Sequence, residues 1–150
     1  VSMSDLIKAS LRMNPDRIVV GEVRGAEAME LLSAMNTGHD GSLSTGHANS
    51  ARDMLSRLET MILMAMDLPL SAIRGQLSSG IDIIVHLGRL RDKSRKVLQV
   101  AEVLGMENDE IQLNMLYEFQ EEGEEDGRIK GRLVSKGQLK SDIKLRAAGK

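Results

Sequence analysis

Residues 17–22 read Arg-Ile-Val-Val-Gly-Glu, a short β-branched run that ends in glycine and a carboxylate. A continuous apolar run bounded by turn signals is typical of a fully buried parallel strand. Residues 14–16, Asn-Pro-Asp, end a helix before it, because the residue that precedes a proline is pushed out of the α region. The sequence therefore predicts a buried strand over 17–21, with Glu22 just past its carboxyl end.

Apolar residues at helical spacing surround this strand in the sequence. They predict helices over 4–13, 25–36, 50–67 and 70–79, and a short second strand over 41–45. After Gly80 the spacing of the apolar residues is no longer helical. The new pattern predicts strands over 81–87, 96–104 and 110–116, with turns at 91–94 and 107–109. Strands that alternate with helices and are followed by hairpins indicate an α/β fold with an antiparallel β-hairpin extension.

Charges separate towards the end of the chain. Residues 107–126 hold nine acidic and no basic residues, whereas residues 127–150 hold eight basic residues and one acidic residue. Runs of like charge punctuated by glycine are typical of a solvated appendage. We therefore expect the α/β part to cover 1–119, and 120–150 to be a charged tail with one short helix near 141–148.

The composition excludes several classes of function. Tyr117 and Phe119 are the only aromatic residues, and a stacking platform for single-stranded nucleic acid needs more. The basic run over 89–96 lies on a predicted turn without aromatic residues, so a solvated turn explains it better, and we expect no nucleic-acid partner. The absence of cysteine excludes disulfides, and no apolar run approaches the ~20 residues that cross a bilayer.

Glu22 is the first candidate for chemistry. Open α/β sheets bind ligands at the carboxyl ends of their strands, where this residue is expected to lie. A carboxylate there can hold Mg²⁺ through water or orient an attacking water, as phosphoryl transfer requires. For a glutamate after an isolated apolar run, a solvated turn residue is the alternative.

Two Thr-Gly-His triplets, at 37–39 and 45–47, bracket the second predicted strand. We expect them to bring two imidazoles and two hydroxyls near the same sheet edge as Glu22. Imidazole N–H and hydroxyl groups are suitable donors to a γ-phosphate oxygen or a catalytic water. Either histidine alone would be read as a turn residue. A zinc site is a poor interpretation of His39 and His47, because their spacing matches no common ligand motif and cysteine is absent.

Two longer stretches carry a resemblance to a known family. Residues 21–28, Gly-Glu-Val-Arg-Gly-Ala-Glu-Ala, and residues 37–49, Thr-Gly-His-Asp-Gly-Ser-Leu-Ser-Thr-Gly-His-Ala-Asn, resemble the Walker B and histidine boxes of the type II/type IV secretion ATPase superfamily. The sequence of these two stretches is similar to that of the CpaF-type branch, which drives tight-adherence (Flp) pili. The similarity extends along the chain as far as Phe119.

The resemblance implies a RecA-like P-loop NTPase core that uses ATP and Mg²⁺. It implies a homohexameric ring at the cytoplasmic face of the inner membrane, where it works with a membrane platform protein to power pilus assembly or protein secretion. It also implies a role for each residue of the two boxes. Glu22 would be the Walker B carboxylate that holds Mg²⁺ through water or positions the hydrolytic water. His39 and His47 would sense the γ-phosphate. Arg24, Thr37 and Thr45 would help to bind the nucleotide.

Two features depart from that pattern, Gly25 and the missing phosphate-binding motif. Gly25 stands where much of the superfamily has aspartate, which favours the CpaF-type branch, and Arg24 can equally brace the turn or a subunit contact. No Gly-x-x-x-x-Gly-Lys-Ser/Thr motif occurs, so the cradle and lysine that bind phosphates are missing. Because the chain begins at Val1 beside a predicted helix, we expect it to be a C-terminal fragment with sequence missing upstream. Because the phosphate cradle and its lysine are missing, we expect this fragment to be inactive alone. A catalytically silent ring-assembly or regulatory module is the alternative.

Overall fold

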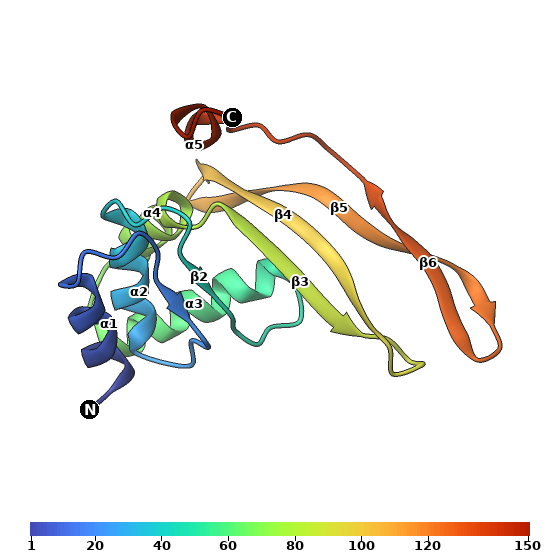
Figure 1. The fold of residues 1–150 in the computed structure, drawn as a ribbon, viewed down its shortest axis with the longest axis horizontal. Coiled ribbons are helices and arrows are strands. Elements are labelled where there is room, and N and C mark those ends of the chain that lie inside the picture. The colour runs from blue at the N-terminus through green and yellow to red at the C-terminus, as the bar shows by residue number, and fades with distance from the viewer.

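The computed structural model describes all 150 residues, which form a helical body beside a long, curved antiparallel sheet (Figure 1). The elements, in chain order, are α1 (Met3–Leu11), β1 (Val19–Val20), α2 (Glu27–Asn36), β2 (Leu43–Ser44), α3 (Ala51–Ala65), α4 (Leu70–Gly80), β3 (Ile83–Arg89), β4 (Arg95–Glu107), β5 (Glu110–Glu125), β6 (Arg128–Ser135) and α5 (Ile143–Ala147). The order of the predicted helices and strands is confirmed as far as β5. None of the helices combines the length and the apolar character that a membrane span needs.

Side-chain caps fix where two of the helices begin. Ser2 accepts a hydrogen bond from the amide of Asp5, whose carboxylate accepts from the amide of Ser2, which is a complete capping box. Ser50 caps α3 through the amide of Asp53, whose carboxylate accepts from the amide of Asn49 instead of Ser50. These contacts satisfy amides that the first turn of a helix leaves without partners.

β1 and β2 pair in parallel, with Val19 opposite Leu43 and Val20 opposite Ser44. The predicted parallel strand is confirmed, but its complete burial is wrong. Val20 is 4% exposed, whereas Val19 is 70% exposed and Leu43 is 62% exposed. Side chains alternate across a strand, so Val20 points into the core of the body while Val19 and Leu43 lie on a face that no element of this chain covers.

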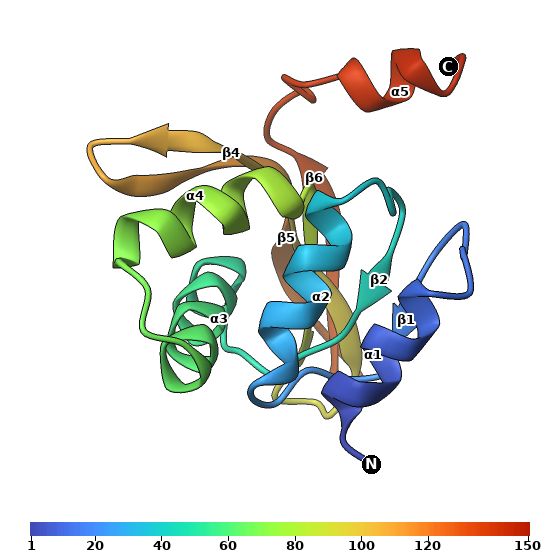
Figure 2. The ribbon, with the colours of Figure 1, turned by 90° about the vertical axis from the view of Figure 1, so that its left-hand side faces the viewer.

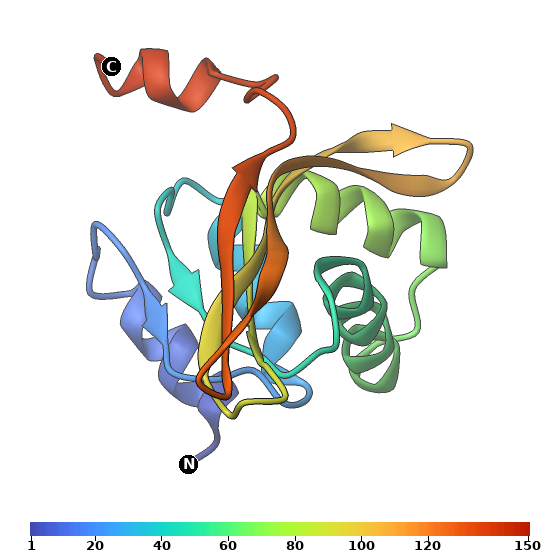
Figure 3. The ribbon, with the colours of Figure 1, turned by 90° about the vertical axis from the view of Figure 1, so that its right-hand side faces the viewer.

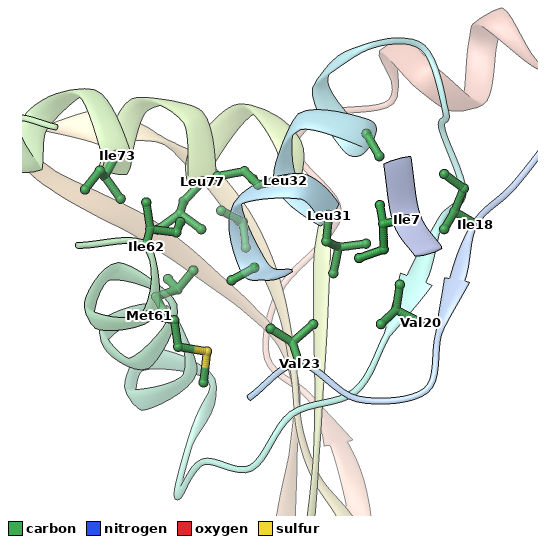
Figure 4. Packing of buried hydrophobic residues seen from close by; sticks show 14 of the residues in the cluster. Ile7, Ile18, Val20, Val23, Leu31, Leu32, Met61, Ile62, Ile73 and Leu77 are labelled. Atoms are coloured by element: carbon green, nitrogen blue, oxygen red, sulfur yellow. The ribbon is translucent and has the colours of Figure 1, made fainter. Parts of the chain in front are cut away.

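The core of the body lies between α1, α2, α3 and α4 (Figure 4). Its most deeply buried large side chains come from α3 and α4, and they are Ile62, Ile73 and Leu77. α3 and α4 also pack on the antiparallel sheet, whose strand order is β3-β4-β5-β6 (Figures 2 and 3). Every neighbouring pair in that sheet is consecutive in the chain, as in a meander.

The solvated tail expected from residue 120 differs from the structure. β5 continues through that position to Glu125, and β6 returns beside it. The acidic residues of β5 face the basic residues of β6 across the hairpin: Arg132 pairs with Glu122 at 2.8 Å, and Lys130 pairs with Glu125 at 3.5 Å. Arg91, from the turn between β3 and β4, also pairs with Glu121 and Glu124. Most of 120–150 is nonetheless exposed, and α5 lies inside the predicted helix range.

Candidate functional site

Glu22 lies directly beyond β1, at the carboxyl end of the parallel pair. Nη2 of Arg24 is 2.6 Å from one of its carboxylate oxygens, and Nε2 of His47 is 2.8 Å from the other. The Glu22 side chain is 25% exposed, while the side chains of Arg24 and His47 are 77% and 82% exposed. The structure therefore brings these three predicted residues together in a charged cluster that is open to solvent on one side.

The electrostatics of the cluster favour the ionised form of Glu22. The Arg24 guanidinium holds the pKa of the Glu22 carboxyl below its ordinary value, and His47 adds a smaller effect in the same direction. An opposite charge in contact favours the charged form of a carboxyl group. Glu22 therefore carries a full negative charge at neutral pH, as a metal-binding or water-orienting carboxylate requires.

Thr45 fixes the turn that carries Glu22. Its hydroxyl donates to the carbonyl of Gly21, and its own carbonyl accepts from the amide of Val23 at 2.9 Å. These bonds join the carboxyl ends of the two parallel strands on either side of Glu22. Because the hydroxyl proton of Thr45 is already donated to the backbone, this residue positions Glu22 and His47 rather than offering a donor to a ligand.

Glu27, the first residue of α2, is a residue of the site that the sequence analysis did not single out. Its carboxylate accepts from the amides of Arg24, at 2.7 Å, and Gly25, at 3.1 Å. The Arg24 amide is the main cause of a pKa for Glu27 below its ordinary value. The signal was available: a glutamate three residues after a turn, at a helix start, reaches back to the turn's amides.

Thr37 and His39 lie at the other end of the parallel pair, so the expectation that both triplets share one sheet edge is wrong. The hydroxyl of Thr37 donates to the carbonyl of Ser33 at 2.8 Å and closes α2. The carbonyl of His39 accepts from the hydroxyl of Ser42 at 2.8 Å, just before β2 begins. Two triplets that bracket one strand necessarily lie at its opposite ends, and only the second reaches Glu22.

A cavity of about 370 Å³ lies between β2 and β3. β2 pairs only with β1 and β3 only with β4, so each strand has a free edge, and residues of both strands line the cavity. Most of the lining is apolar. His39 also lines it, and Nδ1 of that imidazole is buried without a hydrogen-bond partner.

A smaller hollow, of about 120 Å³, is lined by His47 and by His86 of β3. Nδ1 of His86 is buried and has no hydrogen-bond partner. His86 belongs to neither box and sits within an apolar strand pattern, so no sequence signal linked it to His47. The structure places it beside the candidate site.

Comparisons with known proteins identify a family and several relatives. A family model described as type II/IV secretion system protein matches residues 1–134. TrbB, a probable conjugal transfer protein of Sinorhizobium fredii, is 40% identical over 124 residues, which are 81% of this chain and 37% of that protein. PtlH, a type IV secretion system protein of Bordetella pertussis, is 44% identical over 92 residues, which are 59% of this chain and 27% of that protein.

A solved structure is also similar to this chain. The VirB11 ATPase from the Brucella suis type IV secretion system, in complex with sulphate, matches with a TM-score of 0.64 and 33% identity over 68% of this chain and 32% of that one. This likeness supports the RecA-like ATPase fold. The chain spans about a third or less of the length of these relatives.

Proposed function

The chain belongs to the type II/IV secretion system protein family, and from that premise we propose that it carries the hydrolysis-side residues of an ATP-driven motor. The observation that carries the proposal is the cluster of Glu22, Arg24 and His47 at the carboxyl end of β1. A similar fold in a protein described as an ATPase supports the same reaction class. These residues come from the two sequence boxes, and the fold makes them neighbours.

The cluster fits a hydrated magnesium ion and a nucleoside triphosphate. Glu22 is ionised and partly exposed, and Mg²⁺ in nucleotide sites commonly keeps several waters and takes one or two carboxylates. The magnesium ion would neutralise the negative charge that develops on the phosphates during the reaction. Glu22 would hold it through water or orient the attacking water, and the exposed imidazole of His47 would turn from Glu22 to donate to a γ-phosphate oxygen. We assign phosphate sensing to His47 alone, because His39 lies at the opposite end of β2.

Arg24 has a second task in this proposal. It keeps Glu22 ionised in the absence of a metal ion, and its mostly exposed guanidinium remains able to contact a phosphate. Thr45 and Glu27 hold the turn between β1 and α2 in place from two sides. Positioning contributes much of the catalysis in phosphoryl transfer, so these braces matter to the rate.

The phosphate cradle has to come from elsewhere in the complete motor. The free edges of β2 and β3 face a cavity that no strand of this chain fills, and this chain matches only 37% of the length of TrbB. We propose that the part of the relatives without a match here supplies the phosphate-binding loop. The complete protein would act as a homohexamer on the inner face of the cell membrane, with a membrane platform protein. Gly25 supports the CpaF-type branch and hence Flp pilus assembly.

The test is a substitution of Glu22 by glutamine in the full-length protein. Glu22→Gln keeps size and hydrogen bonding but removes the charge, so turnover at saturating ATP should fall at least about 10²-fold while nucleotide affinity changes little. Glu118→Gln, at an exposed position on β5, is the matched control and should turn over like the parent. Parental turnover by Glu22→Gln would leave the silent assembly module as the better account.

A further inference from the structure

Glu102, on β4, is the one buried charged residue of the molecule, at 2% exposure. Its carboxylate accepts three hydrogen bonds: from the side-chain amide of Asn114 at 2.8 Å, and from the backbone amides of Lys140 at 2.9 Å and Ser141 at 2.8 Å. A buried carboxylate is costly unless its oxygens are hydrogen-bonded. Two of its three partners lie in the chain after β6, so Glu102 is an anchor for that segment.

Residues 136–150, here named the C-terminal strap, follow a defined path from β6 to this anchor. The amide of Lys136 donates to the carbonyl of Leu116 at 2.8 Å, which begins the path beside β5. Gly137 then passes so close to β5 that a Cβ atom there would lie 2.9 Å from the carbonyl oxygen of Met115. Asn114 also donates to the carbonyl of Gln138 at 2.8 Å.

Beyond the anchor, α5 carries Lys144 to the gap between the two sheets. Its Nζ lies 2.8 Å from a carboxylate oxygen of Asp40 and 2.9 Å from one of Asp82. Asp40 precedes β2, and Asp82 precedes β3, so one ammonium group contacts the amino ends of both strands. Lys144 also lines the cavity between their free edges.

These contacts act together although each is modest. Lys144 is 45% exposed, and a single surface ion pair contributes little to stability. Two ion pairs from one lysine, however, join segments that no backbone hydrogen bond connects, since β2 and β3 belong to separate sheets. The anchor at Glu102 shortens the free chain that leads to Lys144, which lowers the entropic cost of closing the contact.

We propose that the C-terminal strap is a clasp that sets the separation of β2 and β3: Glu102 anchors it, and Lys144 ties the amino ends of the two strands across the mouth of the cavity. Releasing the strap lets the parallel pair move relative to the antiparallel sheet and opens the cavity at that end. The inference does not depend on the proposed ATPase activity, because it concerns only the arrangement of the two sheets.

The test measures the distance between the two sheets. The chain has no cysteine, so Val19→Cys and Leu87→Cys, at positions 70% and 65% exposed, place a spin label on each sheet of the 150-residue chain. Lys144→Ala should broaden the label-to-label distance distribution and speed hydrogen exchange at the Leu43 amide about two- to tenfold. Lys150→Ala, an exposed lysine at the end of the strap, is the control and should change neither.

Glu102→Gln tests the anchor separately. Glutamine keeps one acceptor oxygen but puts an NH2 donor in place of the other, so at least one of the amides of Lys140 and Ser141 should lose its protection from exchange, and the distances should broaden as in Lys144→Ala. An unchanged distance distribution in folded Lys144→Ala overturns the clasp, as does equal broadening in Lys150→Ala. Protection of Lys140 and Ser141 that survives Glu102→Gln overturns the anchor. Should the buried substitution prevent folding, the surface variant Lys144→Ala still decides the proposal.

Discussion

At the scale of single residues, Glu22 is both paired and accessible. Its contacts with Arg24 and His47 keep it charged, but all three side chains remain at least one-quarter exposed. A carboxylate held in this way is ready to receive a hydrated cation or a polarised water without first losing a proton. A fully buried pair would instead have to be broken before a ligand could enter.

Arg24→Ala should raise the pKa of Glu22 towards its ordinary value, since Arg24 is the main cause that lowers it. Because the folded pKa of Glu22 is depressed, its favourable contribution to stability is present above the unfolded pKa and is lost as pH falls through the folded pKa. The variant should therefore lose less stability than the parent on acidification. Carboxyl ¹³C titration of Glu22 measures the shift directly, with Arg128→Ala, at an exposed position on β6, as the control.

Sequence reasoning succeeded for this site where the backbone alone decides the outcome. Glu22 and His47 both follow the carboxyl ends of parallel neighbours, and strand direction is enough to bring them together. The prediction that Thr37 and His39 lie near Glu22 was wrong, because it was inferred from a repeated triplet and not from strand direction. His86 required knowledge of how β3 lies against the loop after β2, which is a tertiary arrangement that no local pattern encodes.

At the scale of elements, the helices were predictable because capping residues and apolar spacing agree. The second half of β5 and all of β6 were not, since an acidic run is interpreted as solvated until its basic partner strand is known. One local signal was available at the turn between them: Asp126 and Gly127 both have positive φ, +51° and +71°. Asp-Gly with positive φ at both residues is typical of a two-residue hairpin loop.

Gly127→Ala should weaken this hairpin. The left-handed conformation costs a residue with a Cβ atom about 1 kcal/mol or more, so hydrogen exchange at amides of β6 should become faster. Gly105→Ala is a matched control on β4, because a Cβ atom there meets nothing within 4 Å and the backbone is not left-handed. Equal exchange rates in Gly127→Ala and Gly105→Ala would show that the turn does not hold the hairpin together.

At the scale of the whole molecule, each of the two sheets exposes a group of apolar side chains to solvent. Val19 and Leu43 form one on the parallel pair, and Ile83, Val85 and Leu87 form the other on β3, each between 42% and 70% exposed. The second group arises because β3 carries apolar residues on both of its faces. Such a strand is typical of a sheet that is covered on both sides. The fold of this chain covers only one side.

We therefore expect the 150-residue chain to self-associate with rising concentration, because exposed apolar patches favour association. Sedimentation velocity measures this. Leu87→Lys should shift the distribution towards monomer, whereas Leu139→Lys, at a 41% exposed position on the C-terminal strap, should not. A monomer whose sedimentation coefficient and thermal midpoint do not depend on concentration would contradict the expectation.

In the proposed function catalysis also depends on the whole molecule, because the cluster at Glu22 would supply only one side of a phosphoryl-transfer site. Without a cradle of backbone amides and a lysine, the triphosphate has no anchor opposite Glu22, and positioning provides most of the rate in this reaction class. A polypeptide of these 150 residues should therefore release no phosphate from ATP above background. The decisive comparison is between the parent chain and its Glu22→Gln variant, both with Mg²⁺. Turnover in the parent that disappears in the variant would reveal a phosphate site within this chain, and the cavity between β2 and β3 would be the first place to look for it.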